Sequence, residues 1–310
     1  MEEIAPGLQQ LDTLLGGMER LTAGFLVEGP RPALVETGAQ SSAATVIEAL
    51  AGAGVGPGDL RWVVVTHIHL DHAGGVGDVA RAFPAATVVV HQKGARHLAD
   101  PARLISSAAR VYGPLLDDLY GRMVPVEAGR VVAAADGTAL DIGGGRRLRL
   151  IDSPGHAQHH QAVLDEQSGT LLVGDAVGVR LPDAGALRPA TPPPDFDLEQ
   201  AVASLHRFRS LHPTRLVLTH YGPVADPEAT LAEAEQTLHQ WVETAERVLH
   251  DAPGSGVEEL AAALGETQST RSGAPSDAEQ RRLEVLNGVR SNAAGILRYL
   301  ERRATAGPAA

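Results

Sequence analysis

The sequence predicts an α/β fold followed by a helical C-terminal region, and three observations support this prediction. Short apolar runs of strand length alternate with helix-like stretches through the first 220 residues. Several of these runs end directly in His or Asp residues that stand beside small residues. After residue 225 the apolar residues recur at helical spacing. We therefore expect an α/β domain over residues 1–225 and a helical region over residues 226–310.

The expected elements follow from local apolar patterns. Strands are expected at residues 23–27, 33–36, 62–66, 87–91, 147–152, 162–165, 170–174 and 215–219. Helices are expected at residues 41–53, 75–83 and 94–122, the last of them broken near Gly113-Pro114.

A long segment and three helices complete the chain. Residues 178–196 are rich in Pro and Gly, which fits either a functional loop or a stiff surface connection. Asp226 followed by Pro227 is typical of a helix start. Beyond that helix we expect a short helix over residues 257–264, a polar link over 265–277 and a last helix over 278–303.

Composition excludes several classes of partner and site. The formal charge of -12, from 26 basic and 38 acidic residues, disfavours a nucleic-acid-binding protein, since phosphate contacts need clustered Lys and Arg. The absence of cysteine excludes disulfides, so a metal would be held by nitrogen and oxygen. We see no signal peptide and no apolar run near the ~20 residues that span a bilayer. We expect a cytoplasmic protein without membrane contact. Whether it forms an oligomer is left open.

The most informative motif follows the apolar run that ends at Val65. Residues 67–72 read His-Ile-His-Leu-Asp-His, which places three imidazoles and a carboxylate within six residues. Such groups are costly to bury unpaired, and they perturb one another's protonation unless a cation lies between them. The spacing therefore predicts a catalytic metal site. Three further donors follow later strands, each beside a small residue: His156, Asp175 and His220.

In this order, the motifs resemble those of the metallo-β-lactamase superfamily over residues from about 20 to 222. The resemblance implies an αββα sandwich with metal ions at one edge between the sheets. It implies one ion held by His67, His69 and His156, a second held by Asp71, His72 and His220, and Asp175 bridging both. Glu36 resembles the first acidic motif, which is usually structural.

Two dications, zinc first and iron or manganese as alternatives, would suit these ligands. Five neutral imidazoles and two carboxylates leave a surplus of about two positive charges, which a bridging hydroxide and an anionic transition state can absorb. The expected reaction is attack by that hydroxide on a small ester, lactone or thioester. The resemblance suggests that Asp71 also carries a proton to the leaving group.

Three more residues are weaker candidates. His160 lies four residues after His156, and in related enzymes a His at this position usually orients a metal ligand without binding the metal itself. Tyr221 could present its hydroxyl to substrate or simply pack. Arg180, in the proline-rich loop, could meet an anionic substrate group, although a solvated surface arginine is the plainer interpretation.

Two alternatives stay open. One is an iron dioxygenase of the persulfide dioxygenase type, in which His67, His156 and Asp175 form a facial triad. The other is a non-catalytic metal-binding protein whose helical region recruits a partner. Acyl-homoserine-lactone hydrolases usually carry Tyr at the position of Gly178, which argues against that class of lactonase. Flavodiiron proteins carry Glu at the position of His69, which argues against a flavodiiron protein.

Overall fold

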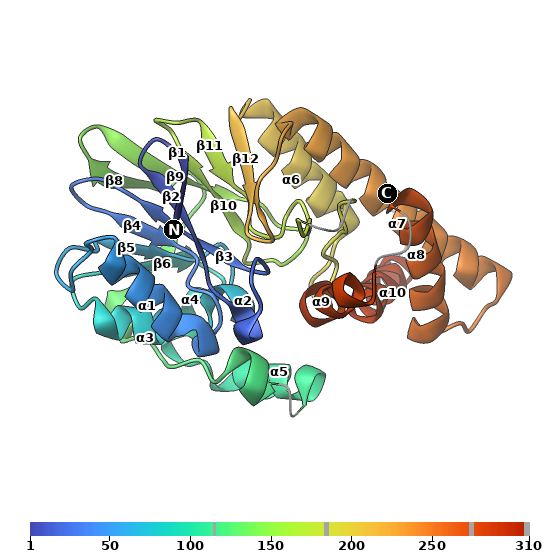
Figure 1. The fold of residues 1–310 in the computed structure, drawn as a ribbon. Helices are drawn as coiled ribbons and strands as arrows, with labels where there is room; N and C mark the ends of the chain where they lie inside the picture. The colour runs from blue at the N-terminus through green and yellow to red at the C-terminus, as the bar shows by residue number, and fades with distance from the viewer. Residues whose placement is uncertain (114–115, 183–185, 273–275, 307–310) are drawn as a thin grey trace. The chain divides into compact units, whose positions relative to one another are not determined.

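The structure is a computed structural model that describes residues 1–113, 116–182, 186–272 and 276–306. Its elements are labelled in Figure 1. The chain divides into two compact units. The first unit contains Met1–Asp152, His159–Gly174 and Thr214–Pro223, and the second contains Ser153–Gln158, Asp175–Pro213 and Val224–Ala310.

The first unit contains a seven-stranded sheet whose strands follow chain order. Its first four strands pair antiparallel, and the remaining pairs, from β4 onward, are parallel. The strands are β1 (Glu2–Ala5), β2 (Leu8–Asp12), β3 (Ala23–Val27), β4 (Ala33–Val35), β5 (Trp62–Val64), β6 (Thr87–His91) and β7 (Val131–Ala134).

A six-stranded sheet completes the first unit in the order β13-β12-β11-β10-β9-β8. Only β11 and β12 pair parallel in it. The strands are β8 (Ala139–Gly143), β9 (Arg146–Asp152), β10 (Gln161–Asp165), β11 (Thr170–Leu172), β12 (Arg215–Leu218) and β13 (Gly222–Pro223).

Apolar side chains from both sheets form one buried cluster. Phe25 and Val64 come from the first sheet, and Leu148 and Val163 from the second. Fully burying a side chain of this kind contributes about 1.5–3 kcal/mol. The two sheets therefore form a sandwich, and the ends of its strands β5 and β12 lead to the predicted donors His67 and His220.

Short helices connect the strands of the first sheet. α1 and α3 contact each other, and α3 also contacts β6 (Figure 1). The Arg130 guanidinium donates to the carbonyls of Phe83 and Ala86, just after α3 ends. The helices are α1 (Ala43–Gly52), α2 (Leu70–Ala73), α3 (Val76–Ala82), α4 (Ala95–Ala99) and α5 (Ala102–Tyr112).

The second unit is helical. The Asp226 side chain accepts a hydrogen bond from Ala229 N at 3.0 Å, and Pro227 starts α7, which confirms the predicted helix start. α8 contacts both α7 and α10, with Trp241 and Ile296 fully buried. The helices are α6 (Leu198–Ser210), α7 (Pro227–Asp251), α8 (Val257–Ser272), α9 (Asp277–Asn287) and α10 (Val289–Ala306). No helix of the described residues is long and apolar enough to cross a membrane.

Two predictions for the C-terminal region are wrong. The polar stretch after residue 264 is not a link, because α8 continues to Ser272 and its Thr and Ser hydroxyls bond back to carbonyls four residues earlier. The expected last helix is two helices, since Gly288 takes an extended conformation between α9 and α10. Residues 273–275 of the predicted link lie outside the described residues, as does Pro114. The domain boundary at residue 225 stays a prediction.

Candidate metal centre

Each predicted donor follows the end of a strand. His67 comes three residues after β5 and His220 two residues after β12. His156 comes four residues after β9 and Asp175 three residues after β11. All four side chains are buried. These placements confirm the strand-end positions expected from the sequence.

The one-turn helix α2 arranges the rest of the first motif. His69 is its N-cap residue, with extended backbone, and the His69 carbonyl accepts from the amides of His72 and Ala73 at 3.1 and 2.9 Å. Asp71 and His72 therefore sit in the first helical turn.

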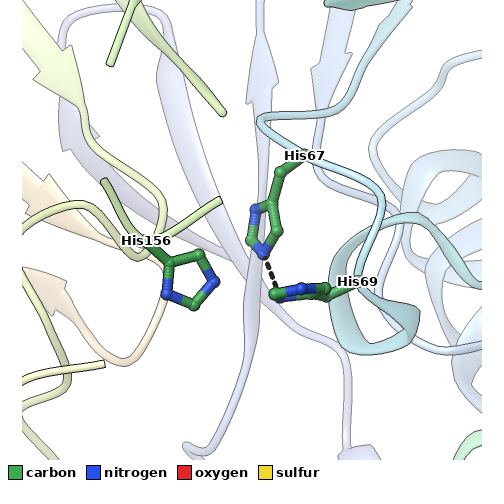
Figure 2. A group of neighbouring side chains, drawn as sticks. All are labelled: His67, His69 and His156. Atoms are coloured by element: carbon green, nitrogen blue, oxygen red, sulfur yellow. Dashed lines mark hydrogen bonds between the residues drawn. The ribbon is translucent and has the colours of Figure 1, made fainter. Parts of the chain in front are cut away.

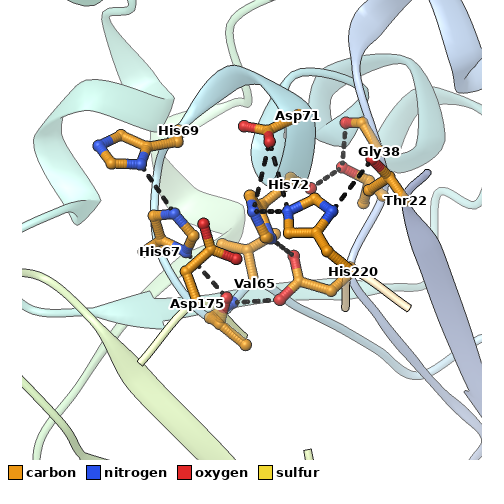
Figure 3. A network of polar contacts seen from close by, with 12 residues as sticks. Thr22, Gly38, Val65, His67, His69, Asp71, His72, Asp175 and His220 are labelled. Atoms are coloured by element: carbon orange, nitrogen blue, oxygen red, sulfur yellow. Dashed lines mark hydrogen bonds and ion pairs between the residues drawn. The ribbon is translucent and has the colours of Figure 1, made fainter. Parts of the chain in front are cut away.

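Three donor atoms of the first unit converge, as Figure 3 shows. His72 Nε2 and His220 Nε2 lie 3.1 Å apart. Asp71 Oδ2 lies 3.6 Å from the first of these atoms and 3.5 Å from the second. The two histidines are fully buried, and the Asp71 side chain is 14% exposed. The structure therefore brings together the three residues predicted to hold the second ion.

Polar contacts behind the rings orient both histidines. His220 Nδ1 lies 2.7 Å from the Leu21 carbonyl oxygen, which can only accept, so Nδ1 carries the proton and Nε2 is the unprotonated nitrogen of the neutral ring. His72 Nδ1 faces the carboxylate of Glu36 at 3.3 Å. Two imidazoles and a carboxylate buried this close together are costly unless they are paired, and a cation among them would pair all three.

The separations suit a metal ion. Donors about 2.0–2.1 Å from a tetrahedral ion lie roughly 3.3–3.5 Å from one another. The observed separations among Asp71, His72 and His220 are 3.1, 3.5 and 3.6 Å. The donors are imidazole and carboxylate, which suit zinc and several other first-row ions. The residues present therefore fit a divalent ion.

His67 and His69 form a second pair of donors. His67 Nε2 lies 2.9 Å from His69 Nδ1, and the rings meet edge to face (Figure 2). His67 Nδ1 lies 3.0 Å from the Thr66 hydroxyl, which fixes the other side of the ring. His67 is fully buried, whereas His69 is half-buried. This pair supplies two nitrogens of the predicted first site.

Two of the predicted donors, His156 and Asp175, lie in the second unit. His156 Nδ1 lies 2.9 Å from the Ala190 carbonyl oxygen and therefore donates to it. His156 Nε2 lies 3.6 Å from Asp175 Oδ2. As for His220 in the first unit, a backbone carbonyl fixes the tautomer, and the opposite ring nitrogen faces a carboxylate.

His160, predicted to support the site, is fully buried with its ring centroid 5.0 Å from that of His67. A side chain at Gly174, whose φ is +52°, would meet His160 Nε2 at 2.5 Å and Thr66 Oγ1 at 2.7 Å. His159 stacks on His67 at a ring-centroid distance of 6.2 Å. The supporting role of His160 stays a prediction that this position favours.

Glu36 is more closely tied to the site than the sequence indicated. Its side chain is fully buried, and its backbone φ is +68°, a conformation that is uncommon for Glu. Oε1 accepts from the Thr66 amide at 3.1 Å, and Oε2 faces His72 Nδ1. One carboxylate thus contacts His72, a predicted ligand of the second ion, and the backbone beside His67, a predicted ligand of the first. The carbonyls of Leu21 and Ala190, which orient two ligands, could not have been found from sequence, because every residue has a carbonyl.

Tyr221 and Arg180, the two weaker candidates, have other contacts. The Tyr221 ring packs against the core cluster of the first unit, and the Arg20 guanidinium lies 5.6 Å from its centroid. Burial raises the pKa of Tyr221, and a hydrogen bond with Gln10 opposes this. Arg180 forms an ion pair with Glu233 of α7. Substrate contacts for both residues stay predictions.

Residues 22–220 match the family described as the metallo-beta-lactamase superfamily. The chain belongs to this superfamily. The predicted α/β fold class, an αββα metallo-β-lactamase sandwich with a C-terminal helical region, is thereby confirmed. The superfamily includes metallo-hydrolases, and the His and Asp groups described above are of a kind that could hold a metal ion.

Two curated relatives of this metallo-beta-lactamase superfamily chain are informative. A metallo-beta-lactamase fold-containing protein of Sulfurisphaera tokodaii is 31% identical over 169 residues, or 54% of this chain. A hydroxyacylglutathione hydrolase of Acidiphilium cryptum is 32% identical over 202 residues, or 64% of this chain. Each alignment covers 62% of the relative, less than two thirds of its length.

Solved structures agree on the fold. An archaeal metallo-beta-lactamase superfamily protein from Sulfolobus tokodaii superposes with a TM-score of 0.62 at 26% identity, over 75% of this chain and 86% of that one. A metallo-beta-lactamase family protein from Thermus thermophilus gives 0.66 at 23% identity, over 97% and 95% of the two chains. At that identity, the second likeness supports the fold alone.

Proposed function

We propose that this chain is a binuclear metal-dependent hydrolase of a small ester, lactone or thioester. The observation that carries the proposal is the convergence of His72 Nε2 and His220 Nε2, 3.1 Å apart, beside the Asp71 carboxylate. In this proposal these three residues hold one ion. His67, His69 and His156 hold the other, and Asp175 bridges both. Within the described residues, Asp71, His72 and His220 are one group whose donor atoms lie close enough together to hold a metal ion.

Assembly of the centre from both units is part of this proposal. Bound dications would lower the pKa of a coordinated water to about 7 and polarise a substrate carbonyl. The protein's own contribution is to keep the histidines as neutral acceptors, through Glu36 and the carbonyls of Leu21 and Ala190. In this proposal Asp71 takes a proton and passes it to the leaving group, and its partial exposure supports that role.

The charges of the side chains favour an anionic transition state. The seven proposed ligands carry two carboxylates against four positive charges on two dications, which leaves a surplus of about two. Glu36, behind His72, reduces this surplus by one without occupying a ligand position. A net positive centre then stabilises the oxyanion that forms when water attacks an acyl group. The Acidiphilium cryptum relative, named as a hydroxyacylglutathione hydrolase, supports an acyl substrate.

The second donor set favours this proposal over a dioxygenase with a single iron. A facial triad of His67, His156 and Asp175 would leave His72 and His220 without an ion, and their Nε2 atoms would still face each other at 3.1 Å. A binuclear hydrolase of a small molecule would use both sets of donors. The proposal includes no nucleic-acid or membrane partner.

The test combines metal analysis with a substrate panel. The purified protein is loaded with zinc, iron or manganese and assayed on aryl esters, lactones and acyl thioesters, with oxygen uptake measured on a persulfide. We expect hydrolysis that depends on a metal and is lost in His72→Ala. Metal-loaded protein that is inert to every ester but consumes oxygen would reject the proposal in favour of the dioxygenase.

A further inference from the structure

We propose that Asn292, on α10, is a positioning residue for His156 and acts through the backbone of residues 189–191. The inference rests on the proposed function, because it takes His156 as a metal ligand. Every contact it uses lies within the second unit. It assigns a role to the C-terminal helices, which lie beyond residues 22–220 that match the superfamily.

The chain of contacts begins at the ligand. His156 is 5% exposed, and its Nδ1 donates to the Ala190 carbonyl at 2.9 Å. That bond selects the tautomer whose Nε2 can bind a metal, and it also sets the plane of the ring. Ala190 lies in a segment without regular secondary structure. The position of its carbonyl therefore depends on what holds the residues on either side.

Asn292 holds the residue after Ala190. The Thr191 amide donates to Asn292 Oδ1 at 2.5 Å, and the Thr191 hydroxyl donates to the same oxygen at 3.0 Å. The hydroxyl also lies 3.2 Å from the Asn292 carbonyl. Thr191 and Asn292 are 0% and 1% exposed, so water does not compete for these bonds.

Asn287 holds the residue before Ala190. Its Nδ2 donates to the Pro189 carbonyl at 2.9 Å, and its Oδ1 accepts from Asn292 Nδ2. The two amide side chains are thus bonded to each other as well as to the backbone on both sides of Ala190. Asn287 ends α9 and Asn292 lies in the first turns of α10, so the break at Gly288 brings both to the loop.

The backbone of α10 also lies close to this loop. A Cβ added at Gly295 would come within 1.8 Å of the Thr191 carbonyl oxygen and 2.7 Å of the Pro192 carbonyl carbon. Only glycine permits this approach. Asn292 and Gly295 therefore act on the same short segment, one by hydrogen bonds and the other by leaving space. Substitution of either should displace the Ala190 carbonyl.

The test measures metal affinity. Apo wild type, Asn292→Ala, Gly295→Ala and Asn292→Asp are titrated with Co²⁺, followed by visible absorption and calorimetry. Loss of a partner that orients a ligand typically weakens metal affinity about 10–100-fold. We expect the lower part of that range for Asn292→Ala and Gly295→Ala. Asn292→Asp keeps the oxygen that accepts from Thr191 but loses the Nδ2 donor to Asn287, so its Co²⁺ affinity should fall by no more than that of Asn292→Ala.

Leu264→Ala is the matched control. Leu264 is fully buried in α8, so its truncation lowers the melting temperature of the same helical unit while leaving the loop contacts in place. Its Co²⁺ affinity should equal that of the wild type. Should Asn292→Ala fail to fold, Thr191→Val removes only the hydroxyl bonds and should still weaken Co²⁺ binding, by a smaller factor.

The outcomes separate the two proposals. Wild type that binds no Co²⁺ rejects the proposed function, and this inference with it. Wild type that binds two ions, together with folded Asn292→Ala and Gly295→Ala variants of unchanged affinity, overturns this inference alone. Equal losses in Leu264→Ala and Asn292→Ala would also overturn it, because they would show a general effect of stability.

Discussion

The carboxylate of Glu36 lies 3.3 Å from Nδ1 of His72, and both side chains are fully buried. Because an ionised carboxylate can only accept, this contact favours the ring form that carries the proton on Nδ1. The same carboxylate accepts from the Thr66 amide at 3.1 Å. Glu36 has a strained backbone, with φ at +68°. Its side chain contacts the predicted ligand His72 and also the loop that leads to the predicted ligand His67.

Glu36→Gln should weaken binding of the second ion about 10–100-fold. If the new amide nitrogen faces His72 Nδ1, two donors meet, and the ring must move its proton to Nε2, the atom that would bind metal. Calorimetric titration with Zn²⁺ measures the change. Glu235→Gln makes the same substitution in a Glu–His pair of the second unit, where Glu235 Oε1 lies 2.8 Å from His206 Nε2. Unchanged zinc affinity in Glu36→Gln would contradict the role given to Glu36.

Gly174→Ala should destabilise the protein. The positive φ costs a non-glycine residue about 1–2 kcal/mol. The new Cβ would also lie 2.5 Å from His160 Nε2 and 2.7 Å from Thr66 Oγ1, both fully buried, and such overpacking costs about 1–3 kcal/mol more. Gly54→Ala has a positive φ of +83° and nothing within 4 Å, so only the backbone cost applies. Denaturant unfolding should show the larger loss for Gly174→Ala; equal losses would count against a tight contact with His160.

The α10–α6 contact should lose stability at high pH. Burial, followed by the hydrogen bond to Glu199, raises the pKa of Tyr299 from 10.0 to about 12. The folded state then keeps a proton that the unfolded chain loses, so this contribution is full below pH 10 and disappears as the pH rises through 12. Tyr299→Phe should show a shallower decline of the unfolding free energy between pH 9 and 11. Parallel declines in the two proteins would refute the assignment.

Most of the fold and the donor set could be predicted because their signals are local. The apolar runs of β3, β5 and β6 can be recognised from a few consecutive residues. The His and Asp residues that follow such runs are spaced as metal ligands often are. The strands β1, β2 and β8 were missed, since they mix apolar and polar residues and depend on pairing with neighbours. β7 was missed because its four apolar residues are too short a run to indicate a strand by themselves.

The parts that could not be predicted depend on backbone groups and distant contacts. The carbonyls of Leu21 and Ala190 fix the tautomers of His220 and His156, yet no residue type distinguishes them. The break between α9 and α10 at Gly288 was also missed, because glycine is tolerated inside many helices. This break lets Asn287 and Asn292 bond to residues 189–191, about 100 residues earlier in the chain. A contact between residues so far apart leaves no local pattern in the sequence.

Asp71→Asn should separate metal binding from proton transfer. The amide keeps an oxygen near His72 and His220 but cannot take a proton. We expect kcat to fall about 10²–10⁴-fold, the usual contribution of a positioned acid or base. Rapid-mixing assays with leaving groups of different basicity provide the readout, because good leaving groups need no proton and should be affected less. A loss that is the same for every leaving group would exclude Asp71 as the proton carrier.

The number of metal ions per chain tests the central claim most directly. Wild type, His220→Ala and His67→Ala are loaded with zinc, dialysed and analysed by plasma mass spectrometry against protein concentration. Two sets of donors predict two ions per chain in the wild type and about one in each folded variant. Less than one ion in the wild type, or the same content in all three proteins, would contradict a binuclear centre built on these histidines.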